Sequence, residues 1–178
     1  MHPLYTVSGA MSTTVRRATP ADDEAIGEIL VAGYVAAYAR KMKHVVVSDE
    51  RKRTLRDVAG KRAIATVVVV EHEGRVTGTV AIFKPGAPTS EAWLPDAADL
   101  RHLAVAPELH GKGLAQPLLD EAERIVRDEW RGKAICLHVR KGNVGVAKLY
   151  AARGYQRSPE GDLTYPDVQL EAYALHFG

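Results

Sequence analysis

The sequence predicts one α/β domain of the α+β kind, in which a mixed, mostly antiparallel sheet is flanked by helices. Two β-branched runs at residues 65–71 and 75–83 are separated by the hairpin signal His72-Glu73-Gly74. A strand, a glycine-rich turn and an amphipathic helix follow at residues 100–128, and strand, helix and strand complete the chain. No internal repeat or linker divides the 178 residues, which is about one domain's length.

Composition and charge narrow the class of protein. Apolar residues make up 46% and charged residues 26% of the chain, close to the averages for globular domains. No apolar run approaches the roughly 20 residues that a membrane-spanning helix needs. The net charge is +2, and acidic residues intersperse with the basic clusters, which is typical of solvated helix faces rather than of a nucleic-acid surface. We therefore expect neither a membrane nor a nucleic-acid partner.

The N-terminal residues and the single cysteine bear on the domain boundary and on the location of the protein. Residues 1–13 are interpreted as an extension before a domain over residues 14–178, because the first ten residues lack the features of a signal peptide. Cys136 lies in an apolar run and has no partner for a disulfide, so we expect a buried structural thiol and a reducing, cytoplasmic location. The histidines show no metal-ligand spacing, and no metal is predicted.

The first elements are a strand and two helices. Val15 to Ala18 is predicted as a short strand. Thr19 and Pro20 have the character of an N-cap and first helical residue, and a helix is expected from there to about Ala39. Ser48-Asp49-Glu50 opens a second, basic helix that is expected to end near Gly60.

Strands dominate the middle of the chain. The β-branched run at residues 63–70 predicts a buried strand. Residues 84–95 carry three prolines and one glycine and are expected to form a loop. A strand over residues 100–106 then leads into a turn at residues 107–113.

The last third alternates helices and strands. Leu114, Leu118, Ala122 and Ile125 lie on one face of a predicted helix. A strand over residues 134–139, a helix from about Asn143 to Ala152 and a final strand near residues 168–175 complete the prediction.

The turn His110-Gly111-Lys112-Gly113-Leu114-Ala115 is the most informative segment. A glycine-rich turn that feeds a helix N-terminus exposes backbone N–H groups, and the helix dipole attracts phosphate there. A dinucleotide fingerprint would need glycine where Gln116 stands, and the spacing of a Walker P-loop is absent. Phosphate binding is therefore expected without either nucleotide motif.

This turn resembles the acyl-CoA pyrophosphate loop of the GNAT superfamily of N-acetyltransferases, in which Arg or Gln, two residues, Gly, one residue and Gly or Ala follow one another. His110, Gly113 and Ala115 occupy those positions, with His110 in place of Arg or Gln. Pro117 is also a departure, and we expect the helix to begin at Gly113 or Leu114 so that the proline falls in its first turn.

A second match is independent of the first. The residues Asn143, Ala147, Leu149-Tyr150 and Gly154-Tyr155 resemble the later helix of the same superfamily. Together the matches span about residues 99–155, roughly a third of the chain. The resemblance implies a splayed, V-shaped acyl-CoA cleft between the strands at residues 100–106 and 134–139, with a β-bulge in the first of them.

The resemblance also implies the function and the binding residues. The protein would transfer an acetyl group from acetyl-CoA to a primary amine by direct attack in a ternary complex, with backbone amides near Val105 polarising the thioester carbonyl. The residues expected to bind acetyl-CoA are Leu103, Ala104, Val105, His110, Gly111, Lys112, Gly113, Leu114, Ala115 and Asn143.

Two proton transfers require catalytic groups. Tyr150 matches the family's general acid, which would protonate the departing thiolate. An amine with a pKa near 10.4 must lose a proton before attack, and Asp99, acting through water, is the candidate base. Glu91, Asp96 and His102 are reserve bases, and ordered water without a dedicated base stays open.

Some questions stay open at this stage. A non-catalytic acyl-CoA-binding or sensing module on the same fold is the alternative function. The acceptor, a small-molecule or peptide amine, is not specified by any motif in residues 34–60, 84–99 or 158–177. A homodimer is one option for the oligomeric state.

Overall fold

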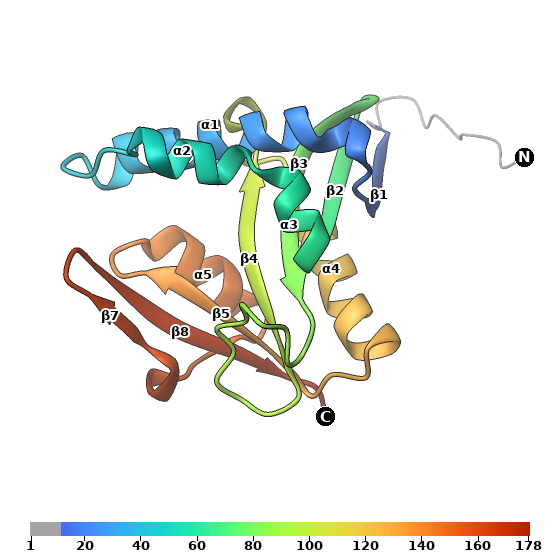
Figure 1. The fold of residues 1–178 in the computed structure, drawn as a ribbon, viewed down its shortest axis with the longest axis vertical. Coiled ribbons are helices and arrows are strands. Elements are labelled where there is room, and N and C mark those ends of the chain that lie inside the picture. Colours follow the sequence, from blue (N-terminus) through green and yellow to red (C-terminus); the bar gives the residue numbers. More distant parts are fainter. Residues whose placement is uncertain (1–11) are drawn as a thin grey trace, which may run out of the picture.

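An open eight-stranded sheet organises the computed structural model, which describes residues 12–178 (Figure 1). The strand order is β1-β2-β3-β4-β5-β8-β6, and β7 pairs with β8. Neighbouring strands are antiparallel except for the parallel pair β4 and β5. The mixed, mostly antiparallel sheet is therefore confirmed. Residues 1–11, most of the predicted extension, lie outside the described residues.

The strands are β1 (Thr13–Arg17), β2 (Thr66–His72), β3 (Arg75–Phe83), β4 (Ala97–Val105), β5 (Ala134–Arg140), β6 (Gln156–Arg157), β7 (Leu163–Tyr165) and β8 (Val168–His176). The helices are α1 (Asp23–Lys41), α2 (Asp49–Arg56), α3 (Val58–Ile64), α4 (Ala115–Arg124) and α5 (Val144–Ala152). Short 3₁₀ turns precede α1 and follow β4 and β6, and a π-helical turn continues α4.

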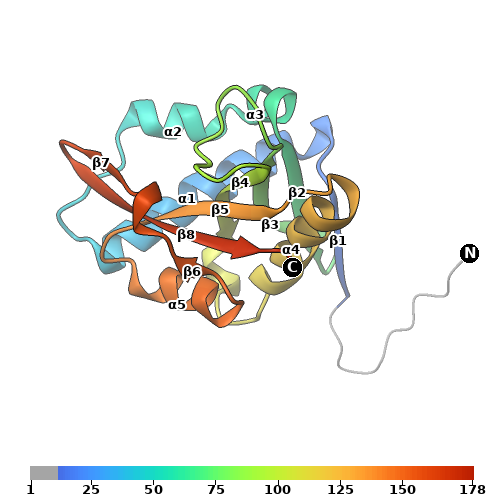
Figure 2. The same cartoon turned by 90° about the horizontal axis from the view of Figure 1, so that it is seen from below.

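Helices cover both faces of the sheet (Figure 2). Val67 and Val69 of β2 pack with α1, α2 and α3, whereas Val68 and Val70 pack with α4 on the opposite face. Successive side chains of a strand point to opposite faces, so a strand that is apolar at every position must be covered on both sides. This is why the β-branched run in β2 does not alternate with polar residues.

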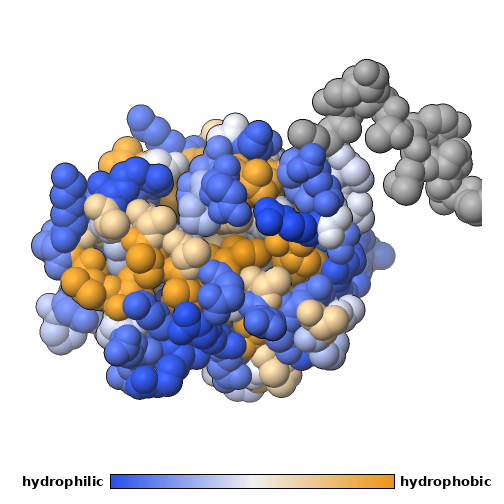
Figure 3. Space-filling model, turned by 90° about the horizontal axis from the view of Figure 1, so that it is seen from above, coloured by the Kyte–Doolittle hydropathy of each residue, from blue (hydrophilic) through white to orange (hydrophobic). Residues whose placement is uncertain are grey.

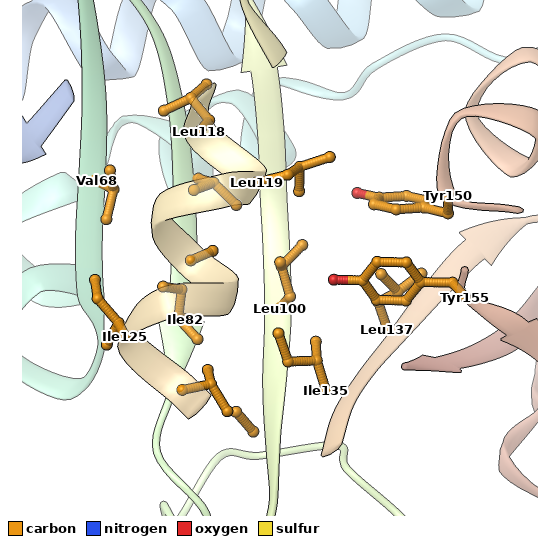
Figure 4. Packing of buried hydrophobic residues seen from close by; sticks show 14 of the residues in the cluster. Val68, Ile82, Leu100, Leu118, Leu119, Ile125, Ile135, Leu137, Tyr150 and Tyr155 are labelled. Carbon is orange, nitrogen blue, oxygen red and sulfur yellow. The ribbon is translucent and has the colours of Figure 1, made fainter. Parts of the chain in front are cut away.

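The core on the α4 face extends to the tyrosines of the C-terminal half (Figure 4). Leu118 and Leu119 of α4 are fully buried against the sheet. Figure 4 shows the rings of Tyr150 and Tyr155 reaching from the α5 side toward α4 and β4. One continuous core therefore joins the two halves of the sheet.

The predicted helix over residues 48–60 is wrong in one respect, because the structure has two helices there. Asp57 has φ −78° and ψ 67°, which are not helical, and it separates α2 from α3. Its carboxylate accepts a hydrogen bond from the Gly60 amide at 3.1 Å and so caps the second helix. The same helix then runs to Ile64, past its predicted end.

Other boundaries differ by a few residues. The helix expected from Gly113 or Leu114 begins at Ala115 with Leu114 as N-cap, and Pro117 does fall in its first turn. The strand expected at residues 100–106 begins earlier, at Ala97. The two short strands β6 and β7, which pair with β8, were not predicted.

Strand β4 carries a bulge and then separates from β5. Thr79 pairs with Ala104 and Ala81 with Arg101, so β4 has one more residue than β3 in this interval. His102 lies within it with φ +59°, the left-handed conformation. Strands β4 and β5 pair only from residues 97–99 to residues 134–136 and diverge beyond that point (Figure 1). The predicted bulge and splay are both present.

Candidate functional site

A cleft of about 670 Å³ opens where β4 and β5 diverge. Its walls come from α1, from β4 at residues 100–105, from the turn before α4, from the end of β5 and from α5. Of the residues expected to bind acetyl-CoA, those that line it are Leu103, Ala104, Val105, His110, Gly111, Gly113, Leu114, Ala115 and Asn143. Lys112 is not part of the lining. The structure thus brings together residues that are up to forty positions apart in the sequence.

The backbone of Val105 faces the open side of β4. The next residue, Ala106, donates its N–H to the Thr77 carbonyl at 2.8 Å, on the β3 side. Because successive residues of a strand direct their N–H and C=O groups to opposite edges, Val105 directs both of its groups away from β3. Strand β5 has already departed at this level, so the Val105 N–H is free to contact a bound molecule in the cleft.

The glycine-rich turn presents a run of free amides at one end of the cleft. Gly111 and Gly113 have φ +81° and +73°, and a Cβ added at either would contact nothing within 4 Å. Within residues 12–178, no acceptor takes a hydrogen bond from the backbone N–H groups of residues 111–115. These amides and the N-terminus of α4 are therefore available to an anion, and phosphate binding at this turn stays a prediction.

His110 is oriented toward the strand rather than along the turn. Its Nε2 lies 3.0 Å from the Val105 carbonyl oxygen. Since that oxygen can only accept, Nε2 carries the proton and donates. The side chain thus connects the turn to the end of β4, and the backbone amides of residues 111–115 remain the groups available to an anion.

Asn143 occupies the N-cap position of α5, but its side chain does not cap the helix. Its Oδ1 accepts a hydrogen bond from Lys41 Nζ at 2.9 Å. Lys41 is the last residue of α1. This contact therefore connects the end of α1 to the start of α5 at the rim of the cleft.

Tyr150 lines the cleft from α5 and is 4% exposed. Its ring packs edge-on against Tyr155, with ring centroids 5.3 Å apart (Figure 4). Burial raises the pKa of Tyr150, the nearby Tyr34 raises it further, and Arg153 opposes the shift. The phenol therefore stays protonated at neutral pH and is able to donate a proton.

Asp99 is fully buried as the third residue of β4, and it does not line the cleft. Its Oδ2 accepts from the Glu91 amide at 2.8 Å and from Arg101 Nε at 2.7 Å. Arg101 also forms an ion pair with Glu91 at 3.2 Å, donates to the Thr89 carbonyl and lies over the Phe83 ring. Asp99 and Arg101 together hold the loop at residues 84–96 against β4.

The three reserve residues lie in different places. Glu91 and His102 line the cleft, whereas Asp96 does not. Burial lowers the pKa of His102 to about 3, and the positive charges of Lys61, Arg51 and Arg101 add to the shift. His102 is therefore neutral at physiological pH. Its Nδ1 is buried and has no hydrogen-bond partner within residues 12–178.

Sequence reasoning missed a row of aromatic and basic side chains along the cleft. Arg51 lies over the Tyr34 ring with 5.5 Å to its centroid, and Arg140 lies over the Tyr38 ring at 5.2 Å. The two tyrosine rings are 6.0 Å apart and perpendicular. The spacing of Tyr34 and Tyr38, one helical turn apart in α1, was the available signal. Nothing local in the sequence points to their arginine partners in α2 and β5.

The family profile of the Acetyltransferase (GNAT) family matches residues 24–155, which include the glycine-rich turn, the bulged strand and Tyr150. The chain belongs to the GNAT family. No curated protein matches the sequence.

Solved structures of GNAT proteins share the fold. An acetyltransferase of the GNAT family from Staphylococcus aureus Mu50 superposes with a TM-score of 0.69 at 12% identity, over 93% of this chain and 99% of that one. The PaiA N-acetyltransferase from Thermoplasma acidophilum, in complex with coenzyme A, gives 0.67 at 17% identity, over 91% and 98%. A GNAT family acetyltransferase from Brucella melitensis, in complex with acetyl-CoA, gives 0.62 at 20% identity, over 94% and 89%.

Two further features of the described residues bear on the chemistry. None of the helices within residues 12–178 has the length and apolar character to cross a bilayer. In the same part of the chain, histidine, cysteine, aspartate and glutamate side chains nowhere gather in a group of three that could hold a metal ion.

Proposed function

We propose that this GNAT protein transfers an acetyl group from acetyl-CoA to a primary amine by direct attack in a ternary complex. The observation that carries the proposal is the continuity of the cleft. It runs from the free amides of residues 111–115, along the open edge of β4, to the buried phenol of Tyr150. The GNAT structures that contain coenzyme A or acetyl-CoA support this use of the shared fold.

The cleft residues fit the parts of acetyl-CoA. The amides of residues 111–115 and the dipole of α4 suit a pyrophosphate. The unpaired edge of β4 at Leu103 to Val105 suits the amide groups of a pantetheine arm, which would add to the sheet much as a strand does. We propose that Asn143, which lines the cleft beside Lys41, contacts the same molecule.

Electrostatic stabilisation is assigned to the backbone of β4. The Val105 N–H points into the gap between the strands, and we propose that it donates to the thioester oxygen, which gains negative charge as the amine nitrogen bonds to the carbonyl carbon. A backbone donor held by a sheet needs little reorganisation during the reaction. The carbon–sulfur bond then breaks as the amide forms.

The two proton transfers are assigned to Tyr150 and to water. Tyr150 remains a neutral phenol at neutral pH because of its burial, so it can give its proton to the departing thiolate. Asp99 lies outside the cleft, with Arg101 and the Glu91 amide on one of its oxygens. We therefore propose that Asp99 positions the loop at residues 84–96 and that ordered water takes the proton from the amine.

The acceptor class, oligomeric state and location stay predictions. A small-molecule or peptide amine fits the family and the open cleft. Hydrophobic side chains form a band between hydrophilic ones on one face of the molecule (Figure 3). A homodimer stays a prediction, which light scattering would test. Cys136 is buried, as expected, and a cytoplasmic location stays a prediction.

Turnover tests the proposal directly. The purified chain is mixed with acetyl-CoA and a panel of amines, free thiol is measured with a chromogenic disulfide, and the acetylated amine is identified by mass spectrometry. We expect thiol release that depends on the amine and matches the amide formed. Binding of acetyl-CoA without amine-dependent thiol release would instead favour the non-catalytic acyl-CoA-binding module.

A further inference from the structure

The charged side chains of the cleft are unequally divided between the two signs. Among the described residues, Glu91 is its one carboxylate, and Glu91 is already paired with Arg101 at 3.2 Å. The basic side chains that line it are Arg40, Lys41, Arg51, Arg101 and Arg140. The cleft therefore has an excess of positive charge that its own carboxylate does not neutralise.

Two arginines of the cleft, Arg51 and Arg140, differ from most of the arginines elsewhere on the chain. Arg16, Arg62 and Arg157, for example, each form ion pairs with aspartates 2.6–2.8 Å away. Within residues 12–178, Arg51 and Arg140 form no ion pair, unlike Arg101 of the same cleft, and each lies over a tyrosine ring. A guanidinium that rests on a ring face keeps its N–H edge available for a planar anion.

Position separates Arg51 from the phosphate-binding turn. Arg51 is in α2, and its charge acts on His102 in the bulge of β4. The turn at residues 110–115 follows the far end of the same strand. Lys41, by contrast, is engaged by Asn143 at the start of α5. We therefore assign Arg51 to the acceptor side of the cleft, and Arg140, the last residue of β5, lines the same cleft.

Buried polar atoms near Arg51 lack partners as well. Lys61 Nζ and His102 Nδ1 are buried, and neither has a hydrogen-bond partner in the described part of the chain. Leaving such groups unsatisfied is costly. The positive charges of Arg51, Lys61 and Arg101 all act on His102, and a bound anion would offset them.

We propose that the acceptor is an amine that also carries a compact anionic group, such as a carboxylate, and that Arg51 binds this group with help from Arg140. The inference rests on the proposed function and specifies its acceptor. Amines that carry only positive charge, such as polyamines, would meet the repulsion of the same arginines and bind poorly.

Matched acceptors test the inference. Glycine, L-alanine, L-leucine and L-phenylalanine are each compared with their amides and with the corresponding aminoalkyl phosphonates, and spermidine is included. We expect kcat/KM to be about tenfold to 100-fold higher for the anionic acceptor than for its amide, since a charged hydrogen bond is lost in the amide. The carboxylate and phosphonate series show which anion is preferred. Equal values for acids and amides, or a preference for spermidine, would overturn the inference.

Variants assign the effect to Arg51. The measured quantity is the ratio of kcat/KM for an amino acid to kcat/KM for its amide. This ratio is expected to approach one in Arg51→Gln and to be intermediate in Arg51→Lys. In Arg140→Gln the ratio should fall less than in Arg51→Gln. Arg53→Gln is the control, because Arg53 is exposed on the same helix and does not line the cleft. An Arg51→Gln protein that keeps the wild-type ratio would contradict the assignment.

A binding readout keeps this inference separate from the proposed function. N-acetylglycine and N-acetylglycinamide are titrated calorimetrically into the protein saturated with coenzyme A, which needs no turnover. Tighter binding of the acid supports an anion site even in a protein that transfers nothing, and in that case only the proposed function fails. Equal binding of the two compounds overturns the inference whether or not turnover is observed.

Discussion

His110 Nε2 donates a hydrogen bond to the main-chain oxygen of Val105 over 3.0 Å. The contact joins the turn that presents the free amides of residues 111–115 to the end of β4, the two parts of the cleft to which we assign phosphate binding and acetyl transfer. The side chain of His110 therefore reinforces the 3₁₀ turn at Pro107–Leu109 that connects these two parts of the cleft. This gives His110 a positioning role that the family's usual Arg or Gln at that place did not suggest.

The first prediction concerns this contact. In His110→Ala the turn loses its tie to β4, and we expect the KM for acetyl-CoA to rise about fivefold, which corresponds to a net hydrogen bond of about 1 kcal/mol. The kcat should change little, because the Val105 N–H remains in place. His110→Gln can still donate and should recover part of the affinity. A loss confined to kcat would contradict the positioning role.

The second prediction uses two glycines with the same backbone conformation. Gly113 and Gly74 have φ +73° and +77°, and an added Cβ meets nothing at either position. Alanine at either site should lower the free energy of unfolding by about 1 kcal/mol through left-handed strain. Only Gly113→Ala should weaken acetyl-CoA binding, by about tenfold. Backbone strain at Gly113 would change the direction of the free N–H groups of residues 111–115, whereas Gly74 lies in the hairpin between β2 and β3. Calorimetry would refute the phosphate site if both variants bound acetyl-CoA like the wild type.

The third prediction separates two neighbouring tyrosines. Tyr150→Phe removes the proposed proton donor but keeps the ring, so kcat should fall about 100-fold with little change in thermal stability. Tyr155 packs beside it but does not line the cleft. The kcat of Tyr155→Phe, measured by steady-state kinetics, should stay within about twofold of the wild-type kcat. Equal losses in the two variants would indicate a packing effect instead of proton donation.

The fourth prediction concerns the ion pair between the buried Asp99 and Arg101. Asp99→Asn removes the charge from the hydrogen bond with Arg101, which keeps its ion pair with Glu91, and we expect a loss of about 2 kcal/mol in unfolding free energy together with faster proteolysis in residues 84–96. The control is Glu28→Gln, which removes an exposed ion pair with Arg56 and should cost less than about 1 kcal/mol. A change in the acidic limb of the pH profile of kcat in Asp99→Asn would instead assign Asp99 as the base.

The fifth prediction follows from the neutral state of His102. Its pKa is lowered from 6.5 to about 3 in the folded protein, so between these values the unfolded chain binds one more proton. Stability is therefore lost as the pH falls below 6.5. The His102 contribution to this loss between pH 7 and pH 5 should be about 2 kcal/mol.

The variant His102→Asn isolates that contribution, because asparagine tolerates the left-handed backbone at this position. Denaturant unfolding of both proteins at pH 7 and pH 5 measures the difference. The wild type should lose about 2 kcal/mol more than the variant between the two pH values. Parallel losses in the two proteins would show that His102 titrates normally in the fold.

The sequence was sufficient for the features that are encoded locally. The β-branched run of β2, the hairpin at Glu73-Gly74 and the amphipathic face of α4 each act within a few residues, and each is present in the structure. The glycine-rich turn was also identified, because its φ values above zero favour glycine.

Features that depend on distant partners were not predicted. The position of the bulge at His102 depends on the register with β3, and the pairing of β6 and β7 with β8 is too short to leave a periodic pattern. The contacts of Arg51 with Tyr34, and of Asp99 with Arg101 and the loop amide at Glu91, arise only once the helices and the loop have packed. The fold and the proposed phosphate-binding turn can therefore be predicted from the sequence more fully than the proposed acceptor site.

Isothermal titration of the purified protein with acetyl-CoA, beside ATP and NAD as controls, tests the central claim most directly. We expect one acetyl-CoA per chain, a dissociation constant on the order of micromolar, and no comparable binding of ATP or NAD. Absence of binding by acetyl-CoA, free CoA and longer acyl-CoAs would contradict the account and leave the turn at residues 110–115 with a purely structural role.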